Sequence, residues 1–320
     1  MLHLRTIVPA DRTDAVCSAL AEHVGVTNVV VVPGAARSPA GDLVTADVAR
    51  EAANEILDAL RALGLDKDGS IAVEKIDLSL SHAADEAERR APGAGDDAVV
   101  WDEFDRQTAE GAGLTWAYLA FLALATQLAA IAAITDSAVL VVGAMVLGPE
   151  FSSIAAICFG IVTRNVRRIA GGARTLVVGF AVAIAITYVC ALASRWIGVL
   201  DISELPHDRP NTAFIYSPDR WSFIVALLAG AAGVLSMTAG KSSALVGVFI
   251  SVTTVPAAGN LAVALVLKHG SEIEGSILQL AVNFAGMLVA GVLTLLVQRV
   301  VWLRVVRRKG GSAERPRPLG

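Results

Sequence analysis

A single glutamate, Glu150, stands inside a long apolar run and directly follows Gly148 and Pro149. If residues 136–163 formed one membrane helix, Pro149 would break it, because proline lacks an N–H and crowds the carbonyl of Met145. Glu150 would then begin the second half-helix, where free N–H groups and the positive end of the helix dipole favour an anion. A carboxylate at membrane depth is costly unless it is paired, hydrated or protonated. The pattern suits proton or cation coupling or a hydrogen bond to a polar solute; a structural carboxyl that satisfies the opposite break is the alternative.

Residues 242–267 repeat this pattern, with an apolar half, Pro256, small residues, Asn260 and a second apolar half. Pro256 would free the carbonyl of Val252 in the same way. Broken backbone at membrane depth is tolerated only where it is buried in protein or lines a wet cavity. Two proline-interrupted spans in corresponding halves of a membrane domain indicate the binding site of a transporter. We therefore expect the two breaks to meet near the middle of the membrane.

Other polar side chains flank the two prolines. Asn260 is the strongest candidate for solute contact, because its amide both donates and accepts hydrogen bonds. Serine and threonine in membrane helices more often bond to their own backbone or to a neighbouring helix. The predicted substrate- or ion-binding residues are Gly148, Pro149, Glu150, Ser152, Ser153, Thr253, Thr254, Pro256, Gly259 and Asn260, with Gln127, Gln279 and Asn283 as a second tier.

No catalytic constellation, cofactor motif or metal site is predicted, and we do not expect an enzyme. The three cysteines are far apart and have no metal-ligand spacing, so neither a disulfide framework nor a zinc site is supported. The tripeptide at 240–242, Gly-Lys-Ser, is similar to the end of a phosphate-binding loop, but Leu235 stands where that loop needs glycine. We interpret it as a cytoplasmic turn with a basic anchor.

The segment 201–221 is predicted to be the longest outer loop. Glu204, His207 and Asp208 within it could bind a metal, but they lack a ligand spacing, so we interpret the segment as a solvated loop. No basic surface that would suit nucleic acid stands out.

The composition places the chain among membrane proteins. Hydrophobic residues make up 55% and charged residues 18% of its 320 residues, which is too apolar for a soluble protein of this length. Six spans are predicted, at residues 114–134, 136–163, 176–197, 223–239, 242–267 and 277–303.

Basic residues set the expected orientation. They follow the second, fourth and sixth spans, at Arg164, Arg167, Arg168 and Arg174, at Lys241, and at Arg304, Arg307, Arg308 and Lys309. Both termini are therefore expected in the cytoplasm, with residues 304–320 as a basic tail. Two successive groups of three spans enter the membrane from opposite sides, which predicts a 3+3 inverted repeat whose middle members are the broken helices.

Residues 1–80 have the pattern of a separate α+β domain. Strands are predicted at residues 2–9, 26–33, 43–48 and 70–80, and helices at 11–24 and 53–63. This βαββαβ order is typical of a ferredoxin-like domain with an antiparallel sheet and both helices on one face. Residues 81–113 are expected to be a linker that is flexible or loosely helical at first. A helix near residues 100–108 then either lies at the membrane interface or packs on the N-terminal domain.

Two segments resemble the signature sequences of a widespread prokaryotic family of polytopic membrane proteins, an uncharacterised "hydrophobic domain" family. The first is GAMVLGPE at residues 143–150, followed by FSSIAAICFGIVTRNV, and it contains the motif GAM-x-x-G/A-P. The second is GVFISVTTVPAAGNLAVAL at residues 247–265, and it contains the motif GV-x-IS-x-x-x-x-P. The resemblance covers most of residues 114–303 and implies a polytopic membrane protein without a defined substrate. In that family the residue after the first proline is often apolar, so Glu150 departs from the pattern.

The sequence therefore predicts a multi-pass protein of the cytoplasmic membrane that acts as a secondary transporter or permease. Its expected partners are a small polar solute, with H⁺ or a cation as the coupling ion, the lipid bilayer and further copies of the chain. No nucleic acid is expected. The alternative is a non-transporting receptor or scaffold, in which the cytoplasmic domain senses a ligand and the membrane domain anchors and assembles it.

Overall fold

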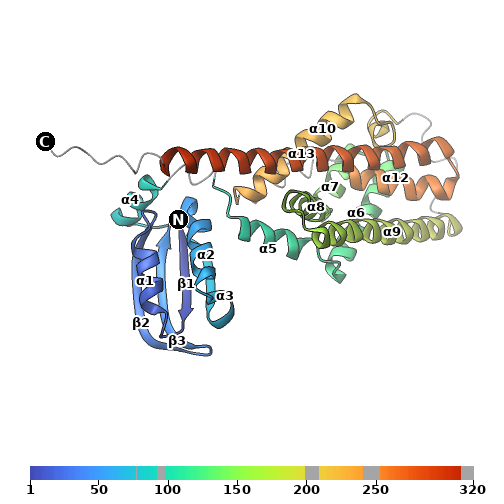
Figure 1. The fold of residues 1–320 in the computed structure, drawn as a ribbon. Coiled ribbons are helices and arrows are strands. Elements are labelled where there is room, and N and C mark those ends of the chain that lie inside the picture. The colour runs from blue at the N-terminus through green and yellow to red at the C-terminus, as the bar shows by residue number, and fades with distance from the viewer. Residues whose placement is uncertain (77, 92–97, 199–208, 241–252, 311–320) are drawn as a thin grey trace. The chain divides into compact units, whose positions relative to one another are not determined.

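The computed structural model describes the chain except for residues 77, 92–97, 199–208, 241–252 and 311–320 (Figure 1). Side chains are described as far as Val301. The chain divides into two compact units. One contains Met1–Glu103 together with Arg299–Gly320, and the other contains Phe104–Gln298.

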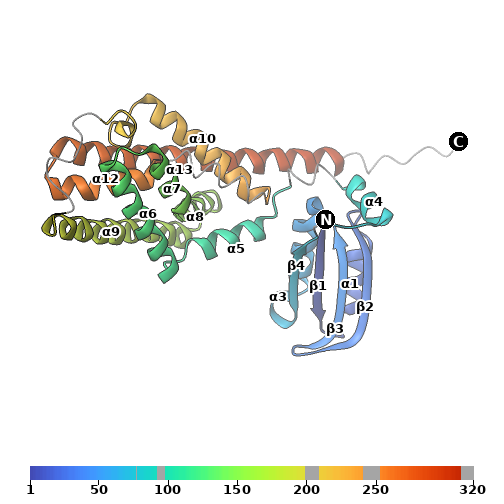
Figure 2. The ribbon, with the colours of Figure 1, turned by 180° about the vertical axis from the view of Figure 1, so that it is seen from behind.

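The first unit is built on a four-stranded antiparallel sheet. Its strands are β1 (Leu2–Val8), β2 (Val26–Arg37), β3 (Ala40–Val48) and β4 (Ser70–Lys75), in the order β2-β3-β1-β4 (Figure 2). Helix α1 (Thr13–Ala21) joins β1 to β2, and α2 (Ala53–Ala62) lies between β3 and β4 in the chain. The predicted βαββαβ order and the antiparallel sheet are confirmed.

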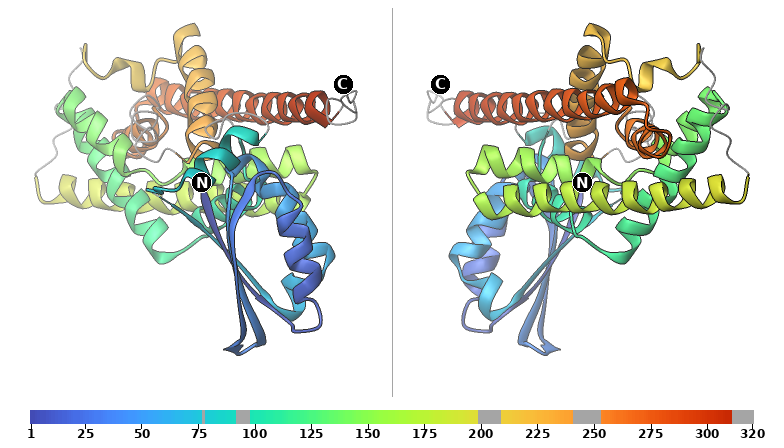
Figure 3. Two further views of the ribbon diagram at one scale, coloured as in Figure 1. Left: turned by 90° about the vertical axis from the view of Figure 1, so that its left-hand side faces the viewer. Right: turned by 90° about the vertical axis from the view of Figure 1, so that its right-hand side faces the viewer.

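One face of this sheet is buried beneath the two helices (Figure 3). Side chains alternate between the two faces of a strand, so every second residue of β1 and β3 faces this core. The helices supply residues at four-residue spacing, as the sequence predicts. The core residues include Leu4, Val8, Val16, Leu20, Val44, Ala46, Ile56 and Leu60.

The boundaries of this unit differ from the prediction at several places. β2 runs through Pro33 to Arg37, which an edge strand permits because the missing N–H of proline removes no bond to a second neighbour. β4 ends at Lys75 instead of continuing to residue 80. A short helix, α3 (Leu65–Asp68), precedes it, and a 3₁₀ turn, η1 (Arg50–Ala52), precedes α2. The beginning of the expected linker forms α4 (His82–Arg90), which the Ser81 side chain caps by accepting a hydrogen bond from the N–H of Ala84.

The second unit is helical. It contains α6 (Trp116–Ile134), α7 (Ala138–Leu147), α8 (Phe151–Thr163), α9 (Val166–Trp196), the 3₁₀ turn η4 (Ala213–Ile215), α10 (Arg220–Thr238), α12 (Thr254–Leu267) and most of α13 (Gly270–Gly310). α6 packs against α7, α9 and α12, and α8 packs against α9.

Membrane-length helices are fewer than the six predicted. Within the described residues, α6, α9, α10 and α13 are long and apolar enough to cross a membrane. α7 and α8 count as a fifth span if they are taken together, and they are bent by 53° at the break that Pro149 predicts. α12 has only 14 residues, and residues 242–252 of the predicted fifth span lie outside the described part. Neither six spans nor an inverted repeat is confirmed.

Two of these helices begin earlier than hydropathy predicts. α9 begins at Val166 instead of residue 176, because the Asn165 side chain caps it by accepting a hydrogen bond from the N–H of Arg168. α13 begins at Gly270 instead of residue 277, so Glu272 lies in its first turn. Hydropathy misses these first turns because polar residues can form part of a helix without adding to its apolar span. α13 also continues past residue 303, so the expected tail begins as helix.

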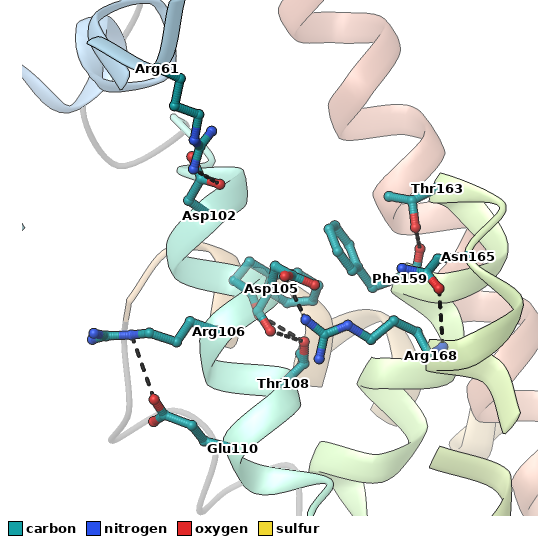
Figure 4. Close-up of polar contacts among 11 residues, drawn as sticks. Arg61, Asp102, Asp105, Arg106, Thr108, Glu110, Phe159, Thr163, Asn165 and Arg168 are labelled. Carbon is teal, nitrogen blue, oxygen red and sulfur yellow. Dashed lines mark hydrogen bonds and ion pairs between the residues drawn. The ribbon is translucent and has the colours of Figure 1, made fainter. Parts of the chain in front are cut away.

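Helix α5 (Trp101–Gly111) contains residues of both units. Within the first unit, Asp102 accepts a hydrogen bond from Arg61 at 2.6 Å (Figure 4). Within the helical unit, Phe104 makes an edge-to-face contact with Phe159 of α8, with ring centroids 5.4 Å apart. Asp105 pairs there with Arg168 of α9 at 2.6 Å (Figure 4). Of the two positions predicted for this helix, packing on the N-terminal domain therefore holds only for its first turn.

Candidate functional site

The break between α7 and α8 leaves Glu150 inside the helical unit. Gly148 has an extended backbone, and Glu150 is the N-cap of α8, with its carbonyl accepting a hydrogen bond from the N–H of Ser153 at 3.1 Å. The Glu150 side chain is 5% exposed, and its Oε2 atom has no hydrogen-bond partner among the described residues. A buried polar atom without a partner is costly. The break is therefore a place where a proton, a cation or a donor group of a solute would be stabilised.

Two hydroxyl groups lie near this carboxylate. Tyr118 of α6 and Ser153 of α8 are both buried, and neither hydroxyl has a hydrogen-bond partner outside this pair within the described part of the chain. The Tyr118 hydroxyl lies beside Ser153 and close enough to Glu150 to interact with its charge. Gly179 of α9 makes room for the ring, since a β-carbon there would approach Tyr118 Cε1 to 2.7 Å. We call these three side chains the break cluster.

The break lies against the first turn of α12. A β-carbon built on Gly148 would meet Cγ2 of Val255 at 2.8 Å. Val255 stands beside Pro256 and Thr254, and the buried Thr254 hydroxyl also has no hydrogen-bond partner among the residues described. The two proline-containing segments are thus neighbours in space, although about a hundred residues separate them in the chain.

One face of α13 is polar and buried. Glu272, Ser276, Gln279 and Asn283 follow at spacings of four, three and four residues, which places them on one side of a helix. Gln279 and Asn283 each donate a side-chain hydrogen bond to the Thr253 hydroxyl, both at 2.8 Å. The second-tier candidates on α13 therefore lie at the start of α12, next to the predicted Thr253.

The other end of this face carries a buried ion pair. Arg209, which is 3% exposed, donates to the Asn260 side-chain oxygen at 2.9 Å and pairs with Glu272 at 2.5 Å. The Asn260 amide nitrogen donates to Ser276 at 3.0 Å. The ring of Tyr216 lies 4.4 Å from the Arg209 guanidinium carbon.

These side chains form a polar column along α13 that consists of two hydrogen-bonded groups, one around Arg209 and Asn260 and the other around Thr253. Glu272 and Asn283 are eleven residues apart on α13, which corresponds to about 16 Å along the helix axis. The column ends at Thr253, and the break cluster follows beyond Val255. The column residues are Arg209, Thr253, Asn260, Glu272, Ser276, Gln279 and Asn283.

The remaining predicted residues have other positions. Ser152 faces Gly111 at the end of α5, where a β-carbon would come within 2.7 Å of its hydroxyl oxygen. Gln127 is half-buried on α6, outside the column. Gly259 allows α12 to approach α6, because a β-carbon there would meet the Thr126 carbonyl oxygen at 2.7 Å. Pro256 is buried in the first turn of α12.

Sequence reasoning missed Arg209, Glu272, Ser276 and Tyr118. The interpretation of the whole segment 201–221 as a solvated loop is wrong, since Arg209, Thr212 and Ile215 are buried. The hydroxyl of Thr212 donates to Asp136 at 2.7 Å, which fixes this segment to the turn between α6 and α7. The residues considered for a metal, Glu204, His207 and Asp208, lie outside the described residues. The polar spacing at 272, 276, 279 and 283 was a signal in the sequence that could have identified this face.

Comparison with known families gives one match. The family model described as "Domain of unknown function (DUF389)" matches residues 145–289, and over that range the chain is similar to this uncharacterised family. The matched range contains the break at Gly148 and the whole polar column. No curated protein and no solved structure matches the chain.

Proposed function

We propose that the protein is an integral membrane transporter or permease that binds a small polar solute inside its helical unit. The observation that carries this proposal is the polar column, which runs along α13 from Arg209 to Thr253 in an otherwise apolar set of helices and ends near the break cluster. Polar groups inside a membrane protein are costly, and they commonly mark the path of an ion or solute. A unit that only anchored the chain would need neither the column nor buried oxygens without partners.

The polar column and the break cluster suit different steps of binding. Thr253, Gln279 and Asn283 offer neutral donors and acceptors that a solute can replace one by one. Glu150 supplies a negative charge at a break in a helix, where transporter folds place their coupling ions and solutes. We therefore assign solute contact to the neutral residues and proton or cation coupling to Glu150.

The proposal also includes the number of membrane crossings and their arrangement. α10 ends at Thr238, whose hydroxyl accepts a hydrogen bond from Gln298 of α13, whereas α12 ends beside Arg195, which donates to the Val266 carbonyl. Glu272 and Gln298 are 26 residues apart on α13, or about 39 Å, so α10 and α12 end at opposite ends of the unit. α12 alone reaches about 21 Å, which is less than a bilayer core of about 30 Å. We infer that a second broken span includes residues before Thr254 and completes six crossings in a 3+3 inverted repeat.

The sheet order β2-β3-β1-β4 favours a ferredoxin-like fold for the N-terminal domain. We assign to it regulation or assembly of copies of the chain, on the cytoplasmic side of the cell membrane. The basic residues that follow α8 support this orientation, with both termini in the cytoplasm. We assign no enzymatic step to either unit.

Counterflow uptake into proteoliposomes tests the proposal. A panel of radiolabelled neutral, anionic and cationic small solutes is offered to the wild type, to Glu150→Gln and to Asn260→Ala. We expect saturable uptake of at least one solute by the wild type and a loss of at least tenfold in both variants, with unchanged folding by circular dichroism. Ser152→Ala is the matched control, because Ser152 faces α5. If no solute is taken up and ligand binding maps to residues 1–103, the receptor or scaffold alternative is correct.

A further inference from the structure

Arg209 occupies a small buried site whose protein atoms are all hydrogen-bond acceptors or an aromatic face. Its Nη2 atom lies 2.5 Å from Glu272 Oε2, and its Nη1 atom lies 2.9 Å from Asn260 Oδ1 and 3.4 Å from the Ala133 carbonyl oxygen. The ring of Tyr216 lies 4.4 Å from the guanidinium carbon. We call these four groups the Arg209 site.

The orientation of the Asn260 amide fixes the polarity of this site. Its nitrogen donates to Ser276 at 3.0 Å and to Glu272 at 3.3 Å, so its oxygen faces Arg209. The site therefore offers oxygen atoms and one negative charge to a planar group that carries several N–H donors. A guanidinium matches this arrangement through directed hydrogen bonds and through stacking on an aromatic ring.

The group that fills the site comes from outside the helices that build it. Ala133 belongs to α6, Asn260 to α12 and Glu272 to α13, whereas Arg209 belongs to the connection between α9 and α10. The Arg209 side chain and Thr212 hold the described part of that connection to the helical unit, so a ligand that replaces the Arg209 side chain need not unfold a helix. If Arg209 left, the Glu272 carboxylate, whose side chain is 14% exposed, would face the exposed His269 ring at 3.7 Å in place of the guanidinium. A largely buried carboxylate that has lost its main ion pair favours uptake of a new cation.

We propose that the Arg209 site is a binding site for a small organic cation with a guanidinium or primary ammonium group. Arg209 is its intramolecular ligand, and a solute displaces it to enter the polar column. The proposal rests on the transport function proposed above and names the class of its solute. A single carboxylate balances one positive charge, so the site suits a monovalent organic cation better than a divalent metal ion.

The covalent attachment of Arg209 sets the expected affinities. A group that belongs to the same chain acts at a high local concentration, on the order of millimolar for flexible tethers. A free guanidinium compound must compete with it, so its apparent affinity for the wild type is reduced by the fraction of molecules in which Arg209 is bound. Removing the Arg209 side-chain charge should therefore raise the affinity for the free cation by about tenfold or more.

The test uses the purified full chain in lipid nanodiscs with methylguanidinium as the probe. Tetramethylammonium at equal ionic strength is the control, because it carries the same charge but has no N–H donor. We expect methylguanidinium to raise the melting temperature of Arg209→Gln at concentrations at least tenfold lower than those needed for the wild type. The effect should disappear in Arg209→Gln/Glu272→Gln. An equal response of Arg209→Gln to both cations, or a response that survives Glu272→Gln, would overturn the proposal.

A second variant keeps the test decisive if Arg209→Gln does not fold. Arg209→Lys keeps the positive charge but loses the planar fork that reaches both Glu272 and Asn260, so it competes less well for the site. Methylguanidinium should stabilise Arg209→Lys more than the wild type at the same concentration. Equal stabilisation of the two proteins counts against the proposal.

Uptake measurements separate this proposal from the function it rests on. Uptake of neutral or anionic solutes, together with an Arg209→Gln variant that is indifferent to methylguanidinium, leaves transport standing and removes the assignment of an organic cation. Specific binding of methylguanidinium without uptake of any solute supports the site and removes transport.

Discussion

Gly148 lies directly against Val255, so close that a β-carbon on Gly148 would come within 2.8 Å of Val255 Cγ2. The contact joins the break after α7 to the first turn of α12. A proline stands next to the contact in each segment, Pro149 after Gly148 and Pro256 after Val255. The contact therefore decides whether the polar column and the break cluster form one region, and it can be tested without knowledge of the solute.

Gly148→Ala should destabilise the protein by about 1–3 kcal/mol, because the added methyl group overlaps Val255 Cγ2 and also meets the Glu150 carboxyl group, which must move aside. The backbone at Gly148, with φ −68° and ψ 123°, suits alanine, so the cost comes from the contact and not from strain. Equilibrium unfolding in detergent measures the change. In a double-mutant cycle, the presence of Val255→Ala should reduce the destabilisation caused by Gly148→Ala by at least about 0.5 kcal/mol. Strict additivity would show that the two segments do not touch.

Gly259→Ala should also destabilise the protein and reduce any function that depends on Asn260. Its β-carbon would lie 2.6–2.7 Å from atoms of Thr126, Ala129 and Ala130, and two of these atoms are backbone, which yields less than a side chain. Gly171→Ala on α9 is the matched control, since a β-carbon there meets nothing within 4 Å. The control should be neutral or slightly stabilising, by up to about 1 kcal/mol, because alanine favours helix more than glycine does. Equal melting temperatures of the two variants would contradict the close packing of α12 on α6.

Glu150→Met separates the functional and structural interpretations of this carboxyl. If Glu150 is kept for function, replacing a buried acid that has an oxygen without a partner by an apolar side chain of similar length should stabilise the protein by about 1–3 kcal/mol. Uptake should be lost at the same time. If the carboxyl instead supports the break, the variant should be less stable than the wild type. Thermal unfolding and uptake of the same preparations distinguish the two outcomes, and Glu110→Met, at an exposed position on α5, serves as the control.

Phe104 should matter more than Asp105 for the attachment of α5 to α8 and α9. Phe104 is 1% exposed against Phe159, so Phe104→Ala should cost about 3–5 kcal/mol. The Asp105–Arg168 pair is partly exposed, so Asp105→Asn should cost about 0.2–1 kcal/mol and less at high salt. Hydrogen exchange of residues 104–111 in the two variants checks this order. A larger effect of Asp105→Asn would mean that charge, and not apolar packing, holds the helix.

Asp42 should make the sheet of the first unit sensitive to acid. Hydrogen bonds from the Thr13 hydroxyl and from the Gly34 N–H lower the pKa of Asp42 below its ordinary value. Because the pKa is lower in the folded chain, the stabilisation is complete above the ordinary carboxyl range and is lost as the pH falls below about 4. Hydrogen exchange in β3 should therefore accelerate on acidification in the wild type. Asp42→Asn should show less of this pH dependence; an identical profile would contradict the role of Asp42.

The sequence was most informative where one residue type dictates the backbone. Pro149 predicted the break after α7, and the alternation of apolar residues predicted β1, β3 and the two helices that cover the sheet. Asn260 could be singled out because an amide in an apolar run needs partners. Its partners could not be identified, because Arg209 and Glu272 stand in polar segments that look like ordinary loops, and only folding brings them into the interior.

The spacing of polar residues along one helix also does not show which neighbouring helix each side chain faces. Ser152 and Ser153 are adjacent and chemically identical, yet one faces α5 and the other is buried near Tyr118. Gln127 and Gln279 are equally plausible from the sequence, but only Gln279 lies on the face that meets Thr253. The choice depends on the rotation of each helix about its axis, which packing against neighbours determines.

Within the helical unit, α13 runs without interruption from Gly270 to Gln298, about 44 Å, which exceeds the thickness of a bilayer core. We expect the turns of one continuous helix to shift together. Release of Arg209 from Glu272 would therefore be felt about 38 Å away at Val297, an exposed position on the same helix. A spin label at Val297 would thus report on events at a buried ion pair that no probe can reach directly.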